Sequence, residues 1–395
     1  MPIIDIEDLG LDAGAHLLIK HALAKVPIGG EVIVSGRAPG WEAQLSAWCR
    51  AQGHPVTFSA DGAHITRNDI HAGRWRGATQ TGHADAQQNS AVHEHPLACY
   101  GLAARGATVE AGTPEFAFRL SEKHEVWTDS AAELYAQAVA AQWDPDQAID
   151  WNVPFDLPDE VEDAVVQVMT YMIENENAAL VVPARFLGQL HPHFREIQAL
   201  LAIQVADEAR HIDVFTRRLR LRGREPALST VGGQASLKTL LDEADFSVAG
   251  FLLSVLGEGT FVSLLNFLHA HAPDPVTRQI ARLAARDEAR HVAFGMAHLL
   301  RRLKHEPEFR TRLTNAVETR NDVLSGTSGL NEEVFDALIL LAAGEFTPTA
   351  IAAGYARVQT LMTDMAEGRL GRLLRLGFEE KTAQRLAALH TRNFM

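Results

Sequence analysis

The stretch Asp-Glu-Ala-Arg-His at residues 207–211 occurs a second time, letter for letter, at residues 287–291. In each copy a glutamate precedes a histidine by three positions, and the two pairs are Glu208 with His211 and Glu288 with His291. Residues three apart on an α-helix lie on one face, about one turn from each other. Each pair can therefore reach the same bound ion.

Both copies lie in long segments of helical character. Apolar residues recur at helical spacing in four segments, at roughly 159–190, 193–222, 240–271 and 275–304. Pro192 separates the first two segments and Pro275 begins the fourth, whereas a longer connection with Gly232 and Gly233 lies between the second and the third. Two tight hairpins joined by one long crossover predict a four-helix bundle.

A two-metal site in such a bundle needs one further carboxylate from each of the other two helices. On the third segment Glu258 stands in a nearly apolar run, where an ionised carboxylate is costly unless a cation compensates it. The first segment offers Glu174 and Glu176, and only one of them can point inward. Glu176 shares its face with Met172 and other apolar residues, so we predict Glu176 as the ligand.

The alternative without a metal is that each Glu-x-x-His pair forms an ion pair on the protein surface. One copy alone would favour that interpretation, but two identical copies with two further glutamates on the correct helices favour a metal site. Carboxylates and imidazoles suit iron or manganese. We expect two iron ions, with a manganese–iron pair or two manganese ions as alternatives.

Other polar residues of the motifs are expected to support the ligands. Asp207 and Asp287 should each accept the free ring N–H of a ligand histidine across the bundle, which fixes the tautomer of that histidine. Arg210 and Arg290 should neutralise the two buried aspartates. His298 shares the face of the second motif, and we interpret it as a core residue or an outer partner, not as a ligand.

Apolar residues one turn from the ligands have two interpretations, a dry chamber beside the metals or ordinary core packing. They are Ala179, Leu180, Phe215, Phe261, Val262 and Phe294. Gly257 and Gly259 flank Glu258 and weaken its helix. This weakness would allow the carboxylate of Glu258 to change its position.

Composition excludes several other classes of protein. The 395 residues carry a formal charge of −14, which argues against nucleic-acid binding through phosphate neutralisation. Only Cys49 and Cys99 are present, too few for a Cys₄ zinc site or an iron–sulfur cluster. No apolar run is expected to span a membrane, and the N-terminus lacks the pattern of a secretion signal. We therefore expect a cytoplasmic protein.

The chain is expected to have four parts. Residues 1–70 alternate helix and strand patterns and end in a hairpin around Asp61-Gly62, which predicts a small α/β two-layer domain. Residues 71–128 are expected to form an irregular linker or cover, 129–310 the bundle, and 311–395 a helical extension packed on it. The order of elements in 1–70 resembles the small sulfur-carrier (TusA-like) proteins. The turn that carries their reactive cysteine reads Asp12-Ala-Gly-Ala15 here, so the resemblance implies a domain without sulfur chemistry.

The two motifs also resemble those of the ferritin-like di-iron carboxylate superfamily, over roughly residues 130–305. The resemblance implies a mainly α fold, with a ferritin-like four-helix bundle and extra C-terminal helices. It implies reductive activation of O₂ at two irons held by Glu176, Glu208, His211, Glu258, Glu288 and His291. Electrons would come from an external reductase or a reduced small molecule, and we expect a homodimer.

Three departures narrow the branch of this superfamily. Phe215 stands where ribonucleotide reductase small subunits commonly carry a radical tyrosine, and Ala284 stands where arylamine N-oxygenases carry an extra histidine. The cysteines of a rubrerythrin-like iron are absent. We expect an oxygenase or oxidase that hydroxylates, desaturates or N-oxygenates a small organic substrate. The alternative is a non-catalytic iron-handling or peroxide-scavenging protein.

Overall fold

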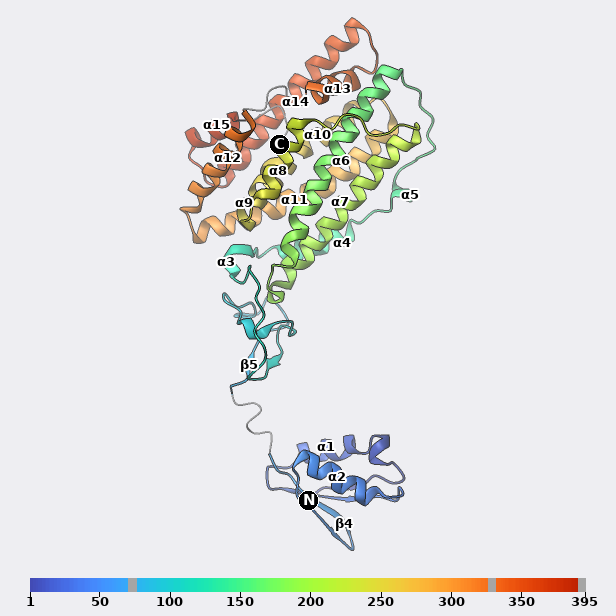
Figure 1. The fold of residues 1–395 in the computed structure, drawn as a ribbon, viewed down its shortest axis with the longest axis vertical. Coiled ribbons are helices and arrows are strands. Elements are labelled where there is room, and N and C mark those ends of the chain that lie inside the picture. The colour runs from blue at the N-terminus through green and yellow to red at the C-terminus, as the bar shows by residue number, and fades with distance from the viewer. Residues whose placement is uncertain (70–76, 326–331, 390–395) are drawn as a thin grey trace. The chain divides into compact units, whose positions relative to one another are not determined.

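The computed structural model describes residues 1–69, 77–325 and 332–389 (Figure 1). The chain divides into two compact units, one formed by Met1–Thr81 with Gly106–Pro114 and the other by Gly82–Arg105 with Glu115–Met395. Outside the described residues lie residue 70 of the expected first domain, residues 71–76 of the expected linker, and residues 326–331 and 390–395 of the expected extension. The four domain boundaries drawn from the sequence stay predictions.

The first unit is a small α/β layer pair. Its main sheet has the strand order β1-β2-β4-β3, with β1 parallel to β2 and the other pairs antiparallel. The elements are β1 (Ile3–Asp5), η1 (Leu11–Ala13), α1 (His16–Ala24), β2 (Glu31–Ser35), α2 (Trp41–Gln52), β3 (Val56–Ser59) and β4 (Gly62–Thr66), followed by the two-stranded sheet of β5 (Thr79–Gln80) and β6 (Thr108–Val109).

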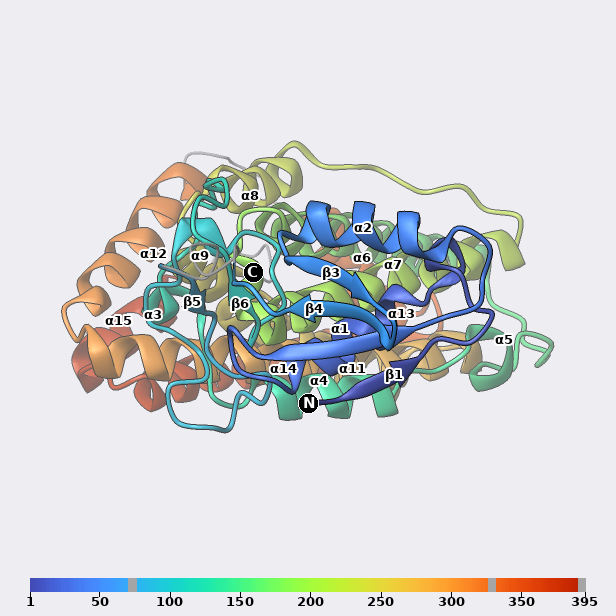
Figure 2. The same cartoon turned by 90° about the horizontal axis from the view of Figure 1, so that it is seen from below.

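Both helices of this unit cover the same face of the sheet (Figures 1 and 2). Val32 and Val34 of β2 alternate toward that face and pack with Ile19 of α1 and Leu45 of α2 in one buried cluster. The hairpin of β3 and β4 turns at the predicted Asp61-Gly62, where Gly62 has a φ of 131°. The predicted two-layer arrangement is confirmed.

The second unit is helical and contains the bundle. Its four long helical segments run alongside one another in Figure 1. They are α6 (Asp159–Leu187), α7 (Arg195–Leu221), the continuous run of α9 (Phe246–Gly250), η4 (Phe251–Glu258) and α10 (Gly259–His271), and α11 (Pro275–His305). The short connection with η3 (Pro192–Phe194) joins α6 to α7. Asp274 caps α11 by accepting a hydrogen bond from the backbone N–H of Thr277.

Further helices surround these four. Preceding them are η2 (Ala98–Tyr100), α3 (Lys123–Val126), α4 (Ala131–Ala140) and α5 (Pro145–Ala148), and following them are α12 (Phe309–Ser325), α13 (Glu332–Ala343), α14 (Pro348–Arg375) and α15 (Glu380–Ala388). Of the C-terminal helices, α13 packs against α6 and α14 packs against α10. The predicted fold class, a helical bundle with extra C-terminal helices and a small α/β layer pair, is confirmed.

Two sequence predictions about the third segment were wrong. The crossover contains its own helix, α8 (Val231–Asp242), and the third segment begins at Phe246, not near residue 240. The run Phe246–His271 is also long and apolar enough to cross a membrane, although no such run was expected. Of its most apolar window, 83% is buried inside the protein, because this segment lies in the core and needs no polar outer face.

The interior of the bundle consists of two apolar clusters. One contains Phe186, Phe194 and Phe294, and the other contains Met172, Phe215 and residues of α10. Along each of the four helices the two clusters are separated by one short polar layer. On α7 this layer falls between Leu201 and Val214, which places the first motif midway along the bundle.

Candidate metal centre

The polar layer brings all six predicted ligands together. Glu176 comes from α6, the first motif from α7, Glu258 from the last position of η4, and the second motif from α11. All six side chains are buried. They form two groups whose ligand atoms all lie within 4.8 Å of one another, namely Glu176, Glu208, His211 and Glu288, and Glu208, Glu258, Glu288 and His291. The groups share Glu208 and Glu288, so these two carboxylates would contribute to both ions of a two-metal site.

Unsatisfied polar atoms test whether metal ions fit this layer. Six buried atoms of the ligand set have no hydrogen-bond partner among the described residues, namely Glu176 Oε1, Glu208 Oε1, Glu258 Oε2, both carboxylate oxygens of Glu288, and His291 Nδ1. Buried polar atoms are rarely left without partners in folded proteins. His291 Nδ1 lies 3.0 Å from Glu208 Oε1 without the geometry of a hydrogen bond. Such donors suit a common cation, so the residues present fit two metal ions.

His211 and His291 each direct ring nitrogen Nδ1 toward the glutamates of the layer. His211 Nδ1 lies 3.4 Å from Glu176 Oε1 and 3.2 Å from Glu208 Oε2. The other nitrogen of each ring points to an aspartate on the opposite helix. His211 Nε2 lies 3.1 Å from Asp287 Oδ2, and His291 Nε2 lies 3.3 Å from Asp207 Oδ2. These reciprocal cross-bundle contacts are those expected from the sequence, and they leave Nδ1 of each ring for a metal.

The pKa values of the ligand residues reflect the crowded charges of this layer. Burial, and then the charges of Glu208 and Glu288, raise the pKa of Glu176 well above its usual value. Burial and Glu288 do the same for the pKa of Glu258. Although burial opposes it, the nearby carboxylates raise the pKa of His211 well above the ordinary histidine value. The clustered carboxylates thus stabilise positive charge in this layer, whether protons or metal ions carry it.

Asp207 and Asp287 are held in place by further side chains that donate hydrogen bonds to their carboxylates. Arg210 Nη2 bridges the two, at 2.5 Å from Asp207 Oδ1 and 2.8 Å from Asp287 Oδ2, and Arg290 Nη2 contacts Asp287 Oδ1. Sequence reasoning missed two further donors. Gln142 Nε2 donates to Asp207 Oδ1 at 2.7 Å, and Trp143 Nε1 donates to Asp287 Oδ2 at 2.8 Å. They stand on an irregular connector, where no periodicity identifies them.

Glu258 occupies an irregular helical position. It ends the π-helical segment η4, which was not predicted, and Gln204 Nε2 donates to its Oε1 at 3.1 Å. Single π-turns are frequent at functional sites. Gln204 precedes Glu208 by one turn on the same face, so a buried glutamine beside a ligand was a usable sequence signal. Gly259 has a packing role, since a Cβ there would lie 2.5 Å from the guanidinium carbon of Arg372.

A small apolar cavity of about 30 Å³ is lined by Gln204, the residue that donates to Glu258. Its walls come from α6, α7, α9, η4 and α11, and they include Gln204, Ser254, Phe294, Gly295 and His298. Of the six residues for which a chamber and core packing were both open, only Phe294 lines this cavity, and Ala179, Phe215 and Phe261 lie in the apolar clusters of the core. Apolar residues one helical turn from a ligand lie on either side of the ligand layer. Phe215 and Phe261 lie on the side away from this cavity, in the second apolar cluster.

His298 is buried and lies outside the ligand groups, in agreement with the interpretation from the sequence that it is not a ligand. Its Nδ1 lies 3.3 Å from the carbonyl oxygen of Trp127, and its Nε2 lies 2.9 Å from Ser247 Oγ. Burial lowers the pKa of His298 to about 4, so its ring is neutral at the end of the cavity. It belongs to neither of the two ligand groups.

Comparison with known proteins gives structural neighbours only. No family model matches the chain, and no curated protein matches it. A variant of an R2-like ligand-binding oxidase with an aerobically reconstituted Mn/Fe cofactor is 17% identical, with a TM-score of 0.47, over 65% of this chain and 94% of that one. A protein with aldehyde deformylating oxidase activity from Synechococcus is 18% identical, with a TM-score of 0.42, over 58% of this chain and 96% of that one. Both TM-scores are below 0.5, so the function has to be inferred from the residues of this chain.

Proposed function

We propose that the chain is an O₂-activating two-metal oxidoreductase that acts on a small, largely apolar organic substrate. One observation carries the proposal. Two buried ligand groups share Glu208 and Glu288, so one layer of the bundle can hold two metal ions. A small apolar cavity lies next to Gln204, which donates to Glu258. A site that only stores iron needs no such cavity, which favours the oxidoreductase over iron handling.

The six ligand residues and the residues around them would have different roles. Glu176 and His211 would hold one metal, Glu258 and His291 the other, and Glu208 and Glu288 both. When bound, two iron ions would supply the electrons that reduce O₂, and an external donor would restore them. Asp207 and Asp287 orient the histidine rings, and Gln204 holds one oxygen of Glu258.

The cavity contributes exclusion of water. Leu253, Phe246 and Phe186 line it with hydrocarbon, and neutral His298 adds no charge to it. A substrate without charge would therefore be favoured, and water would have few hydrogen-bond partners inside.

Metal analysis and O₂ uptake test the proposal together. The purified chain is loaded with Fe(II) in the absence of O₂, and bound iron is measured before O₂ and a reductant are added. We expect two irons per chain and O₂ consumption that continues as long as the reductant lasts. Iron that accumulates far beyond two per chain would instead identify a storage protein.

Two neighbouring glutamates on α6 give a matched pair of variants. Glu176→Gln should lose metal, whereas Glu174→Gln, a half-buried residue outside both ligand groups, should keep it. Equal metal content in the two variants would contradict the assignment of Glu176.

A further inference from the structure

The cavity lined by Gln204 has the volume of a very small molecule. It measures about 30 Å³. One water-sized molecule needs roughly 10–15 Å³ of such space, so the cavity has room for a molecule of about two or three heavy atoms. A longer organic molecule does not fit. Size alone therefore limits the occupant to water, a gas or another molecule of this size.

The walls of this cavity are mainly hydrocarbon. They include the buried side chains of Val182, Phe186, Leu201, Phe246, Leu253 and Phe294. Transfer of an apolar molecule from water to such surroundings is favourable, whereas water gains nothing from them. The apolar walls therefore favour an occupant that forms no hydrogen bonds.

The polar side chains of the lining, Gln204, Ser254 and His298, are engaged elsewhere. Gln204 Nε2 donates to Glu258 Oε1 at 3.1 Å, and the Ser254 hydroxyl also hydrogen-bonds to Glu258. Both ring nitrogens of His298 have partners outside the cavity. In the described part of the chain, none of these three side chains has a buried polar atom without a hydrogen-bond partner. Because a water molecule needs about two to four polar partners, we expect the cavity to be dry.

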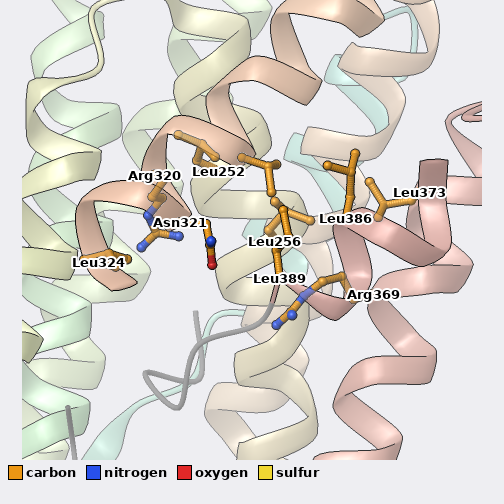
Figure 3. A pocket seen from close by; sticks show the side chains of 10 residues that line it. Leu252, Leu256, Arg320, Asn321, Leu324, Arg369, Leu373, Leu386 and Leu389 are labelled. Carbon is orange, nitrogen blue, oxygen red and sulfur yellow. The ribbon is translucent and has the colours of Figure 1, made fainter. Parts of the chain in front are cut away.

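A second cavity of the helical unit provides a comparison within the same molecule. It lies between η4, α12, α14 and α15 and also measures about 30 Å³. Figure 3 shows Arg320 and Asn321 on one side of it and Arg369 on the other, among leucine side chains. Guanidinium and amide N–H groups can donate hydrogen bonds to water. An apolar molecule of the same size is therefore less favoured in this arginine-lined cavity than in the dry one.

Two residues connect the dry cavity with the ligand layer. Gln204 and Ser254 line the cavity, and both hydrogen-bond to Glu258. The second oxygen of Glu258, Oε2, is buried and has no hydrogen-bond partner among the described residues, so it is available to a metal in the ligand group that contains His291. The cavity is therefore within one side chain of a metal ligand.

We propose that the dry cavity binds O₂ and holds it beside Gln204 and Ser254, within one side chain of Glu258. This role rests on the proposed function, in which O₂ is consumed at the metals. O₂ has two heavy atoms, no charge and no need for hydrogen bonds, so it matches both the volume and the walls of the cavity. The binding is noncovalent and transfers no electrons. Its effect is to raise the local concentration of O₂ near the ligand layer.

Xenon and O₂ itself test the cavity in the full chain prepared without metal. Xenon is an apolar atom that binds in dry protein cavities. In crystals under xenon pressure we expect xenon between Val182, Leu253 and Phe294, and none beside Arg320. In solution under O₂ pressure, the paramagnetism of O₂ should shorten the relaxation times of the Leu253 methyl protons more than those of Leu256, which lines the arginine-lined cavity.

Two substitutions on α6 form a matched pair. Val182→Leu adds a methylene group to the wall of the dry cavity, whereas Val168→Leu adds the same group in the second apolar cluster, away from it. Val182→Leu should lose most of the bound xenon. It should also raise the O₂ concentration at which iron(II) in the loaded chain is oxidised at half its maximal rate, and Val168→Leu should change neither quantity. Leu201→Ala enlarges the cavity and should bind more xenon than the wild type.

Water in place of xenon in the dry cavity, or equal relaxation of the Leu253 and Leu256 methyl protons, would overturn the proposal. The same O₂ dependence in the Val182 and Val168 variants would overturn it as well. Absence of gas binding in a chain that still consumes O₂ with two irons bound would count against the O₂ cavity alone. Gas binding in a chain that takes up no iron would instead overturn the proposed function and leave the O₂ cavity standing.

Discussion

Replacing Asp287 by asparagine tests the cross-bundle pairing most directly. Four donors converge on this carboxylate. His211 Nε2, Trp143 Nε1 and Arg210 Nη2 reach Oδ2 at 3.1, 2.8 and 2.8 Å, and Arg290 Nη2 reaches Oδ1. An asparagine has the same shape, so the substitution changes charge and hydrogen bonding while the packing stays the same.

The magnitude follows from these four contacts. An asparagine amide presents one oxygen and one NH₂ group, and the NH₂ group cannot accept from any of the donors. With its oxygen toward His211, Trp143 and Arg210, it loses the charge-assisted bond to Arg290, worth about 1.5–3 kcal/mol. The histidine also loses a charged partner, and such changes typically lower metal affinity about 10–100-fold. We expect a folded chain that is somewhat less stable and that holds its metal about 10–100-fold more weakly.

Chelator competition measures the metal affinity, and circular dichroism during heating measures the stability. Asp213→Asn is the control, because Asp213 lies on α7 close to His211 but is exposed. The reasoning is refuted if Asp287→Asn keeps the metal affinity of the wild type within a factor of about two, well inside the range expected for loss of an orienting partner. Loss of affinity in both variants would equally count against a specific role of Asp287.

Two further predictions concern the stability of the bundle. In the metal-free chain the pKa values of Glu176 and His211 are raised above 4.5 and 6.5, so the stabilisation from their protonation is lost as pH rises through the raised values. The midpoint of thermal unfolding of the chain without metal should therefore fall as the pH rises above 6.5, the ordinary pKa of histidine. Bound metal requires deprotonated ligands and should remove this fall, and a flat profile without metal would contradict the prediction. Arg218 is buried between Glu162 and Asp274, at 2.8 and 3.0 Å, so Arg218→Met should cost about 3–5 kcal/mol in urea unfolding, because two buried carboxylates lose their partner. Arg217→Met, whose ion pair is exposed, should cost no more than about 1 kcal/mol, and equal costs would show that the buried network is not what stabilises this region.

The parts of the site that the sequence predicted are those encoded by local spacing. Glu-x-x-His at one turn fixes a face, and the choice of Glu176 over Glu174 needed only the apolar neighbours of each residue. The structure brings Glu176 and Glu258 into the two ligand groups and leaves Glu174 out of both. That the six residues bind metal stays a prediction.

The parts that the sequence did not predict depend on contacts between distant positions. Gln142 and Trp143 reach their aspartates across 65 and 144 positions of the chain, from a connector without periodicity. The π-helical segment η4 was not predicted, because the apolar residues that surround Glu258 fit an α-helix equally well. Strand β1 is three residues long, too short for an alternating pattern to identify it.

The two cavities explain why η4 is so apolar. Leu252 and Leu256 line a cavity together with Arg320 and Arg369. Leu253 and Ser254 line the cavity next to Gln204, and Glu258 belongs to the ligand layer. A segment that is buried on opposite faces cannot keep the one-sided apolar stripe of an ordinary amphipathic helix. Its apolar character, which by length and composition alone would fit a membrane span, thus follows from its position between two internal cavities.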